Sequence, residues 1–212
     1  MYKFFGLVLI SALAAVGADR TNINAPLDKV IEWVNNQQRQ GGTTVVPLPE
    51  VQLDSKVKYS NALFLGADSI KRTSDCWQEV NGNEYVFDIN YGFGLMTIVL
   101  PHLEIAGINM TAYVNIRDNS VHMSYTVKMV DEKCHVKLNK LKVEKLENVE
   151  FRASRPEYDG TNLDGLFKLL VIPTLNGFVD SNIASLETSL QGLCHVNDFQ
   201  NAGHVQDVVK SL

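Results

Sequence analysis

Two Cys-His pairs are the residues most suited by type to bind a metal ion. Cys134 is followed by His135, and Cys194 is followed by His195. Thiolates and imidazoles are the ligands that zinc prefers, but zinc sites usually separate paired ligands by roughly two to four residues. A strand would also point adjacent side chains to opposite faces. We therefore expect no metal site and no cofactor.

The other residues that could act as acids, bases or nucleophiles show no catalytic spacing. The sequence lacks the GxSxG, HExxH, CxxC and phosphate-loop motifs. Its histidines are scattered, at His102, His122, His135, His195 and His204. Gly92 and Gly94 lie inside a strand pattern, where glycine usually marks a bend rather than a phosphate site. We expect no catalytic residues, and a protein that is not an enzyme.

Alternating aromatic, aliphatic and methionine side chains are the residues that suggest binding. The first stripe is Tyr85, Phe87, Ile89, Tyr91, Phe93 and Leu95. The second stripe is Val121, Met123, Tyr125, Val127 and Met129. Spacing of two puts each stripe on one face of a strand. Such a face usually packs in a core, but it can also line a pocket, where methionine adapts to irregular ligands.

A helix and an extended connector precede these strands. Apolar residues recur at helical spacing from Leu27 to Val34, so we predict a helix that begins near Asn24 and ends at Gly41-Gly42. The two prolines of Val45–Pro49 cannot continue a helix and predict an extended connector.

The region from Val51 to Arg152 is predicted to be rich in strands. A short strand carries Ala112, Val114 and Ile116. The polar residues Arg117–Ser120 then predict a hairpin turn around Asp118-Asn119. Long antiparallel strands with one apolar face form a curved sheet that another element must cover.

A long helix over Leu166–Leu193 is predicted to supply that cover. Its apolar stripe is Val179, Ile183, Leu186, Leu190 and Leu193. Pro173 should kink or divide the helix. A polar tail follows from Asn197.

The N-terminal residues have the pattern of a secretory leader. Lys3 precedes the apolar run Phe4–Val16, and Val16-Gly17-Ala18 matches a signal peptidase site. The run is shorter than the roughly 20 apolar residues that a membrane span needs. We expect a signal peptide over residues 1–18, a secreted extracellular protein, and a single domain over residues 19–212.

The charge and the cysteine content limit the kinds of partner and covalent link that the chain can have. A net charge of −5 disfavours nucleic acid, whose phosphates need clustered cations. A lysine run over residues 128–145 alternates with apolar residues, as on a solvated strand face; a minority of such runs bind anionic head groups. Three cysteines, at Cys76, Cys134 and Cys194, imply one disulfide and a free thiol, or a link to another chain. Spacing leaves all three pairings open. Asn109-Met110-Thr111 is a glycosylation triplet.

Three segments resemble the group-seven dust-mite allergens and the insect juvenile-hormone-binding and takeout-like carriers. Val46–Pro49 resembles the connector after their first helix. Leu65–Asp75 resembles their GL-x-x-[MI]-[KR]-R segment, with Ala67 in place of the usual leucine. Leu170–Asn176 resembles the opening of their final helix. These families share the tubular lipid-binding fold of the bactericidal permeability-increasing protein superfamily.

The resemblance implies an α+β fold, in which a long curved antiparallel sheet wraps around a long C-terminal helix, with an N-terminal amphipathic helix. It implies that the apolar stripes line a tunnel, and the predicted ligand-binding residues are Phe87, Ile89, Tyr91, Phe93, Met123, Tyr125, Val127, Leu175, Val179 and Ile183. By analogy with the hormone-binding relatives, Cys134 pairs with Cys194 and Cys76 stays free. The N-terminal cysteine pair of those carriers is absent, which favours the mite-allergen branch.

These inferences predict a non-enzymatic carrier of a lipid or other hydrophobic small molecule in an arthropod's extracellular fluid. The alternative is an innate-immune protein that recognises microbial lipids, with transient contact with a membrane or microbial surface. An esterase-like enzyme is the third and least favoured hypothesis.

Overall fold

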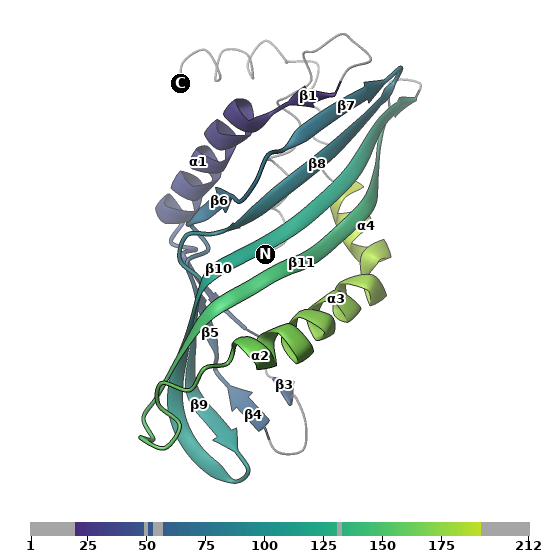
Figure 1. The fold of residues 1–212 in the computed structure, drawn as a ribbon. Helices are drawn as coiled ribbons and strands as arrows, with labels where there is room; N and C mark the ends of the chain where they lie inside the picture. Colours follow the sequence, from purple (N-terminus) through teal and green to yellow (C-terminus); the bar gives the residue numbers. More distant parts are fainter. Residues whose placement is uncertain (1–19, 49–50, 53–56, 131–132, 192–212) are drawn as a thin grey trace.

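A strongly curled antiparallel sheet, followed by helices near the C-terminus, makes up the fold of the computed structural model (Figure 1). The structure describes residues 20–48, 51–52, 57–130 and 133–191. The predicted α+β class is confirmed in this form. The predicted leader and Cys194 lie outside the described residues.

Two long strands run through the middle of the sheet. β10 (Ile108–Val130) and β11 (Lys133–Ala153) pair antiparallel along most of their length. On its other side, β10 pairs with β8 (Glu84–Phe93) over Val121–Lys128. Nearer its start, β10 pairs instead with β9 (Thr97–Ile105). The sheet therefore has two parts that share β10 and β11.

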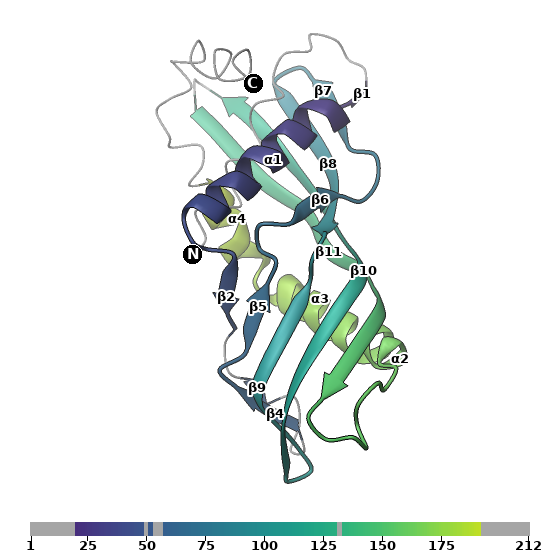
Figure 2. The ribbon, with the colours of Figure 1, turned by 90° about the vertical axis from the view of Figure 1, so that its left-hand side faces the viewer.

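The shorter strands extend each part. β7 (Trp77–Asn81) pairs with β8, and β1 (Thr21–Asn22) pairs with β7. The remaining strands are β6 (Ile70–Arg72) beside β8, β4 (Val57–Ser60) and β5 (Leu63–Leu65) beside β9, β2 (Val45–Pro47) beside β5, and β3 (Val51–Gln52) beside β4. Figure 2 shows the two parts at opposite ends of the molecule.

The predicted hairpin around Asp118-Asn119 is wrong, because these residues lie inside β10. Asn119 is only 6% exposed. Its Oδ1 accepts the Phe93 N–H at 2.6 Å, and its Nδ2 donates to the Phe93 carbonyl at 3.0 Å. Asn119 thus completes the backbone hydrogen bonding where β8 ends. The polar residues that resemble a turn mark the split of the sheet, and β10 continues because β11 pairs on both sides of it.

Asn119 also explains why the first apolar stripe ends early. β8 stops at Phe93, whereas the stripe was predicted to reach Leu95. The Leu95 N–H is instead bonded to the Ser69 hydroxyl at 2.9 Å, and Leu95 is exposed. Gly92 is required beside Asn119, because a Cβ at this position would lie 2.5 Å from the Asn119 carbonyl oxygen.

Four helical segments follow β11 in the described residues. They are α2 (Asp164–Leu166), the π-helical turn η2 (Phe167–Val171), α3 (Ile172–Ser181) and α4 (Ile183–Gln191). The helical run begins before the predicted Leu166. Pro173 lies in the first turn of α3, directly after η2, where the widened turn tolerates its missing N–H. The interruption comes instead at Asn182, whose φ is −115°.

The C-terminal helices cover the exposed edge of β11 with polar side chains. The Asn176 Oδ1 accepts the Val143 N–H at 2.8 Å, and its Nδ2 donates to the Val143 carbonyl at 3.0 Å. Gln191 likewise accepts the Val136 N–H and donates to the Cys134 carbonyl, each at 2.7 Å. These amides supply the hydrogen bonds that a neighbouring strand would supply.

Two carboxylates complete this row. Asp164 accepts the Val149 N–H at 2.7 Å, and Glu187 accepts the Leu138 N–H at 3.0 Å. The steps from Asp164 to Asn176 and from Asn176 to Glu187 are each about three turns of helix, which keeps the side chains on one stripe. The polar stripe of these helices is therefore turned toward the sheet.

A second helix is attached in the same way near β6. α1 (Asn24–Gln40) contributes Asn35, whose Oδ1 accepts the Ile70 N–H at 3.0 Å. Its Nδ2 donates to the Ile70 carbonyl at 2.8 Å. The Asn35 side chain is buried. An asparagine thus pairs with both backbone groups of one residue at each of two separate edges.

We predict that Asn176→Ala lowers the free energy of unfolding by about 1–3 kcal/mol, because it leaves the partly buried backbone groups of Val143 unpaired. Urea denaturation measures this change, and hydrogen exchange should show faster exchange of the Val143 amide. Thr174→Ala is the control, since Thr174 is an exposed residue of the same helix. Equal stability and exchange in the two variants would contradict this role.

Candidate functional site

The two predicted apolar stripes meet on one surface of the sheet. Phe87 is paired with Tyr125, Ile89 with Met123, and Val127 with Tyr85. The Phe87 and Tyr125 rings stack at 4.9 Å with an interplanar angle of 8°. We call this surface the inner face, and it comprises Phe87, Ile89, Tyr91, Met123, Tyr125 and Val127. Six of the predicted ligand-binding residues are therefore neighbours.

Residues from α1, β11 and α4 pack against the inner face. Leu27 and Ile31 of α1, Leu138 of β11 and Leu190 of α4 belong to the same buried apolar cluster. Phe87 and Tyr125 are among the most deeply buried side chains. The inner face is thus covered in this structure, and a ligand would have to enter between the sheet and its helices.

The remaining four predicted residues lie elsewhere. Phe93 meets Phe64 edge-on, with ring centroids 5.1 Å apart. Leu175 and Val179 belong to α3, and Ile183 begins α4. None of these four belongs to the buried part of either apolar cluster.

The C-terminal helices carry an uncovered apolar surface. None of the ten residues of α3 is buried. Leu169 is 80% exposed and Phe178 is 67% exposed. The helix stripe, as we call it, is Leu166, Leu169, Leu170, Leu175 and Phe178, all exposed. Sequence reasoning identified only Leu175 of this set; the continuous apolar run Leu169–Ile172 was a signal, since such a run is apolar all around a helix.

A buried glutamine lies beside the inner face. Gln78 of β7 is paired with Phe87 and is 1% exposed. Among the described residues, no hydrogen-bond partner is found for its Nε2. Sequence reasoning missed Gln78, because a single glutamine in a short strand is an ordinary surface residue by pattern.

The inner face is apolar and its hydroxyl groups are neutral. Burial raises the pKa of Tyr91 to about 12 and raises the pKa of Tyr125 well above its usual value. The cause is desolvation, which disfavours the phenolate. The inner face therefore offers apolar contact and neutral hydroxyls, with no charged group of its own.

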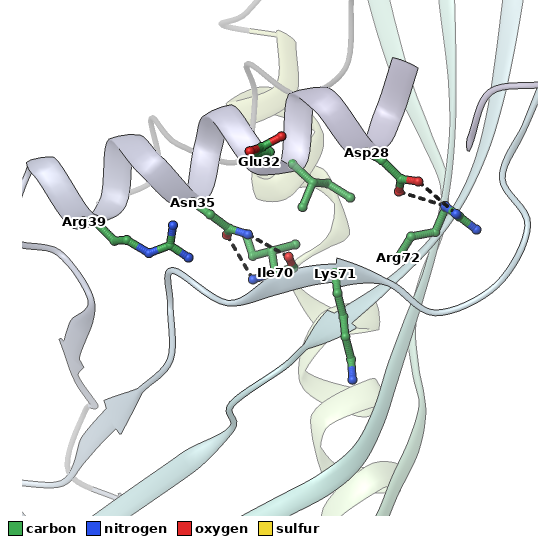
Figure 3. A pocket seen from close by; sticks show the side chains of 8 residues that line it. Asp28, Glu32, Asn35, Arg39, Ile70, Lys71 and Arg72 are labelled. Carbon is green, nitrogen blue, oxygen red and sulfur yellow. Dashed lines mark hydrogen bonds and ion pairs between the residues drawn. The ribbon is translucent and has the colours of Figure 1, made fainter. Parts of the chain in front are cut away.

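An open groove of about 350 Å³ lies between α1 and β6 (Figure 3). Both carboxylate oxygens of Asp28 accept hydrogen bonds from Arg72 at 2.9 Å, and this bonding raises the pKa of the Arg72 guanidinium. Asn35 is bonded to Ile70 in the same groove, and Figure 3 shows Lys71 pointing away from α1. Because its polar groups bond one another, the groove is the attachment of α1 rather than a ligand site.

The cysteine and glycosylation predictions remain predictions. Cys76 is a buried free thiol, and burial raises its pKa. Cys134 lies in β11, beside the end of α4. Its predicted disulfide partner Cys194 lies outside the described residues. Asn109 is exposed near the turn between β9 and β10, where its side chain is accessible.

Histidine and acidic residues form no metal cluster in the part of the chain that the structure describes. His122 lies 3.1 Å from the Asp88 carboxylate and 3.2 Å from that of Glu144. The described residues also contain no helix long and apolar enough to cross a membrane.

Comparison with known proteins adds no relative. No protein-family model matches the chain, and a search of curated proteins finds no significant match. The resemblance to tubular lipid-binding proteins therefore rests on the three short segments described above.

We predict that Tyr91 makes the protein sensitive to alkaline pH. The pKa of Tyr91 is raised in the folded state, so the stability it contributes is complete below about pH 10 and is lost as the pH rises toward 12. Tyr91→Phe should reduce the loss of unfolding free energy between about pH 9 and pH 11 by about 1 kcal/mol. Urea denaturation at the two pH values measures it.

Tyr113→Phe is the control for this experiment, because Tyr113 is exposed. It should leave the pH dependence unchanged. If Tyr91→Phe and Tyr113→Phe behave alike, the inner face is not the source of the alkaline sensitivity.

Proposed function

We propose that this protein binds and carries a lipid or another hydrophobic small molecule between the inner face and the C-terminal helices. The observation that carries the proposal is the helix stripe, an exposed apolar surface on helices that adjoin the edge of the sheet. Exposed apolar surfaces of this kind mark ligand grooves or interaction sites. In this proposal the sheet wraps around the helices and the ligand fills the space between them.

Burial of apolar surface supplies enough free energy for such binding. Each Å² removed from water contributes about 25 cal/mol. A ligand that buries about 300 Å² therefore gains roughly 7 kcal/mol, which corresponds to a micromolar dissociation constant before ordering costs. Met123 adapts its shape to the ligand more readily than a branched side chain does. No charged group is needed.

The C-terminal helices are the elements proposed to move when the ligand enters. α2 and α3 bury no residue of their own, and Asp164 and Asn176 bond them to β11. Phe167 of η2 and Leu190 of α4 are the buried apolar contacts of the C-terminal helices. Hydrogen bonds at an exposed edge exchange with water at a small net cost. α1 is the more firmly attached cover, because it buries Leu27, Ile31 and Val34.

Carriage predicts that the secreted protein copurifies with a hydrophobic molecule. Native mass spectrometry followed by organic extraction should release a lipid in stoichiometric amount. The double variant Leu175→Ser/Phe178→Ser should take up a fluorescent fatty acid at least about 10-fold more weakly. Both residues are exposed, so the fold should tolerate the change.

Asp180→Asn is the matched control, since Asp180 is an exposed polar residue of α3. It should bind the probe as the wild-type protein does. A protein that is empty after secretion and also fails to take up the probe would rule out carriage.

A second candidate function is recognition of lipid surfaces, as in innate defence. Leu169 and Phe178 are the most exposed members of the helix stripe, and Lys168 is the only charged residue between positions 165 and 179. An apolar helix face with a cation can lie in the interface of an anionic membrane. This function needs contact with a surface but no stable carriage.

We predict that Leu169→Ser separates the two functions. If the helix stripe enters membranes, wild-type protein should float with vesicles of phosphatidylcholine and phosphatidylglycerol, and Leu169→Ser should lose most of this binding. If Leu169 contacts only the membrane, uptake of the soluble fluorescent probe should be the same in both proteins. Weaker uptake by Leu169→Ser would show instead that the helix stripe holds the ligand. Lys71→Ser is the control for altered surface polarity away from the stripe. Wild-type protein that does not float would exclude surface recognition and leave carriage as the function.

A further inference from the structure

Gln78 breaks the rule that buried polar groups find partners. Its side chain is 1% exposed, and its Nε2 is the only buried side-chain nitrogen or oxygen without a partner among the described residues. An unsatisfied buried donor destabilises a fold, whereas an apolar side chain of the same size would not. A group outside the chain that accepts from this amide would account for a glutamine here.

Gln78 stands at one end of an apolar row that crosses the sheet. It is paired with Phe87 of β8, Phe87 with Tyr125 of β10, and Tyr125 with Leu138 of β11. Paired residues project from the same side of a sheet, and neighbouring strands lie about 4.8 Å apart, so the row is about 14 Å long. It therefore suits an elongated ligand with its polar end at Gln78.

Among the described residues, the side chains that cover this row supply no partner for the amide. The buried cluster around Phe87 includes Ile23, Leu27 and Ile31 on the α1 side and Leu190 of α4. All of these side chains are apolar. The amide hydrogens of Gln78 therefore point to a ligand acceptor that arrives when the helices separate from the sheet.

The residues around Gln78 indicate which kind of ligand oxygen could accept its hydrogen bond. The buried polar side chains of the described residues are Asn35, Gln78, Thr97 and Asn119, and none of them is a cation that could neutralise a carboxylate. Burying an unpaired carboxylate is far more costly than burying a neutral carbonyl. One N–H of a neutral amide replaces the hydrogen bond to water that a carbonyl or hydroxyl oxygen loses when it is buried.

We propose that Gln78 is the polar anchor of the ligand site. Its Nε2–H donates a hydrogen bond to a neutral oxygen, a carbonyl or hydroxyl, at one end of a long apolar ligand. The chain of that ligand lies along Phe87, Tyr125 and Leu138. This role rests on the proposed carrier function and defines the chemical class of its cargo.

The test compares two probes of equal chain length, 2-heptadecanone and heptadecane, each displacing the neutral fluorescent dye Nile red. In the wild-type protein the ketone should bind about 10-fold more tightly than the alkane, as expected for one additional hydrogen bond. Gln78→Met keeps the length of the side chain but cannot donate. It should abolish this preference, leave the alkane affinity unchanged, and raise the urea midpoint.

The outcomes separate the two proposals. If both proteins bind both probes and Gln78→Met keeps the preference for the ketone, Gln78 is not the anchor and the carrier function stands. If the wild-type protein binds neither probe nor the dye, the carrier function fails and the anchor with it. Gln78→Leu provides the same comparison should Gln78→Met fail to fold.

Discussion

The exposed edge of β11 is the constraint on which the rest of the structure depends. A strand edge presents backbone donors and acceptors that must be paired or hydrated, and that otherwise recruit another chain. Here Asn176 and Gln191 pair with this edge as a strand would, and Asp164 and Glu187 accept further N–H groups. Asn35 does the same for Ile70 near β6.

In α3, which buries no residue, this manner of sealing an edge departs from the usual arrangement of an amphipathic helix. In most globular proteins the apolar stripe faces the core and the polar stripe faces water. The C-terminal helices turn polar side chains toward β11 and bury Leu190, while the helix stripe remains exposed. A second exception to the usual distribution lies in the core, where the polar side chain of Gln78 is buried among apolar residues. Under the proposed carrier function, the exposed apolar groups and the unpaired amide of Gln78 suit a long apolar ligand with one polar end.

Some of this architecture could be predicted from the sequence, and the errors have identifiable physical causes. Alternation correctly placed Phe87, Ile89, Met123, Tyr125 and Val127 on one face, because the side chains of any strand alternate regardless of its partners. The hairpin at Asp118-Asn119 was wrong because asparagine bonds to nearby backbone both in turns and at the end of a strand. Only the neighbouring strands distinguish the two: β8 ends beside Asn119, while β11 continues.

The sequence by itself determined the apolar faces of the strands and the place of the C-terminal helical region, since these follow from local periodicity, but not the continuity of β10. Only the tertiary structure decided which faces are covered. Whether Asn176 is a helix residue facing water or a partner for Val143 depends on where β11 lies. Whether Gln78 is a surface residue or a buried donor depends on what covers β7. Burial and pairing depend on residues that are brought together from distant parts of the chain, so the local sequence pattern cannot predict them.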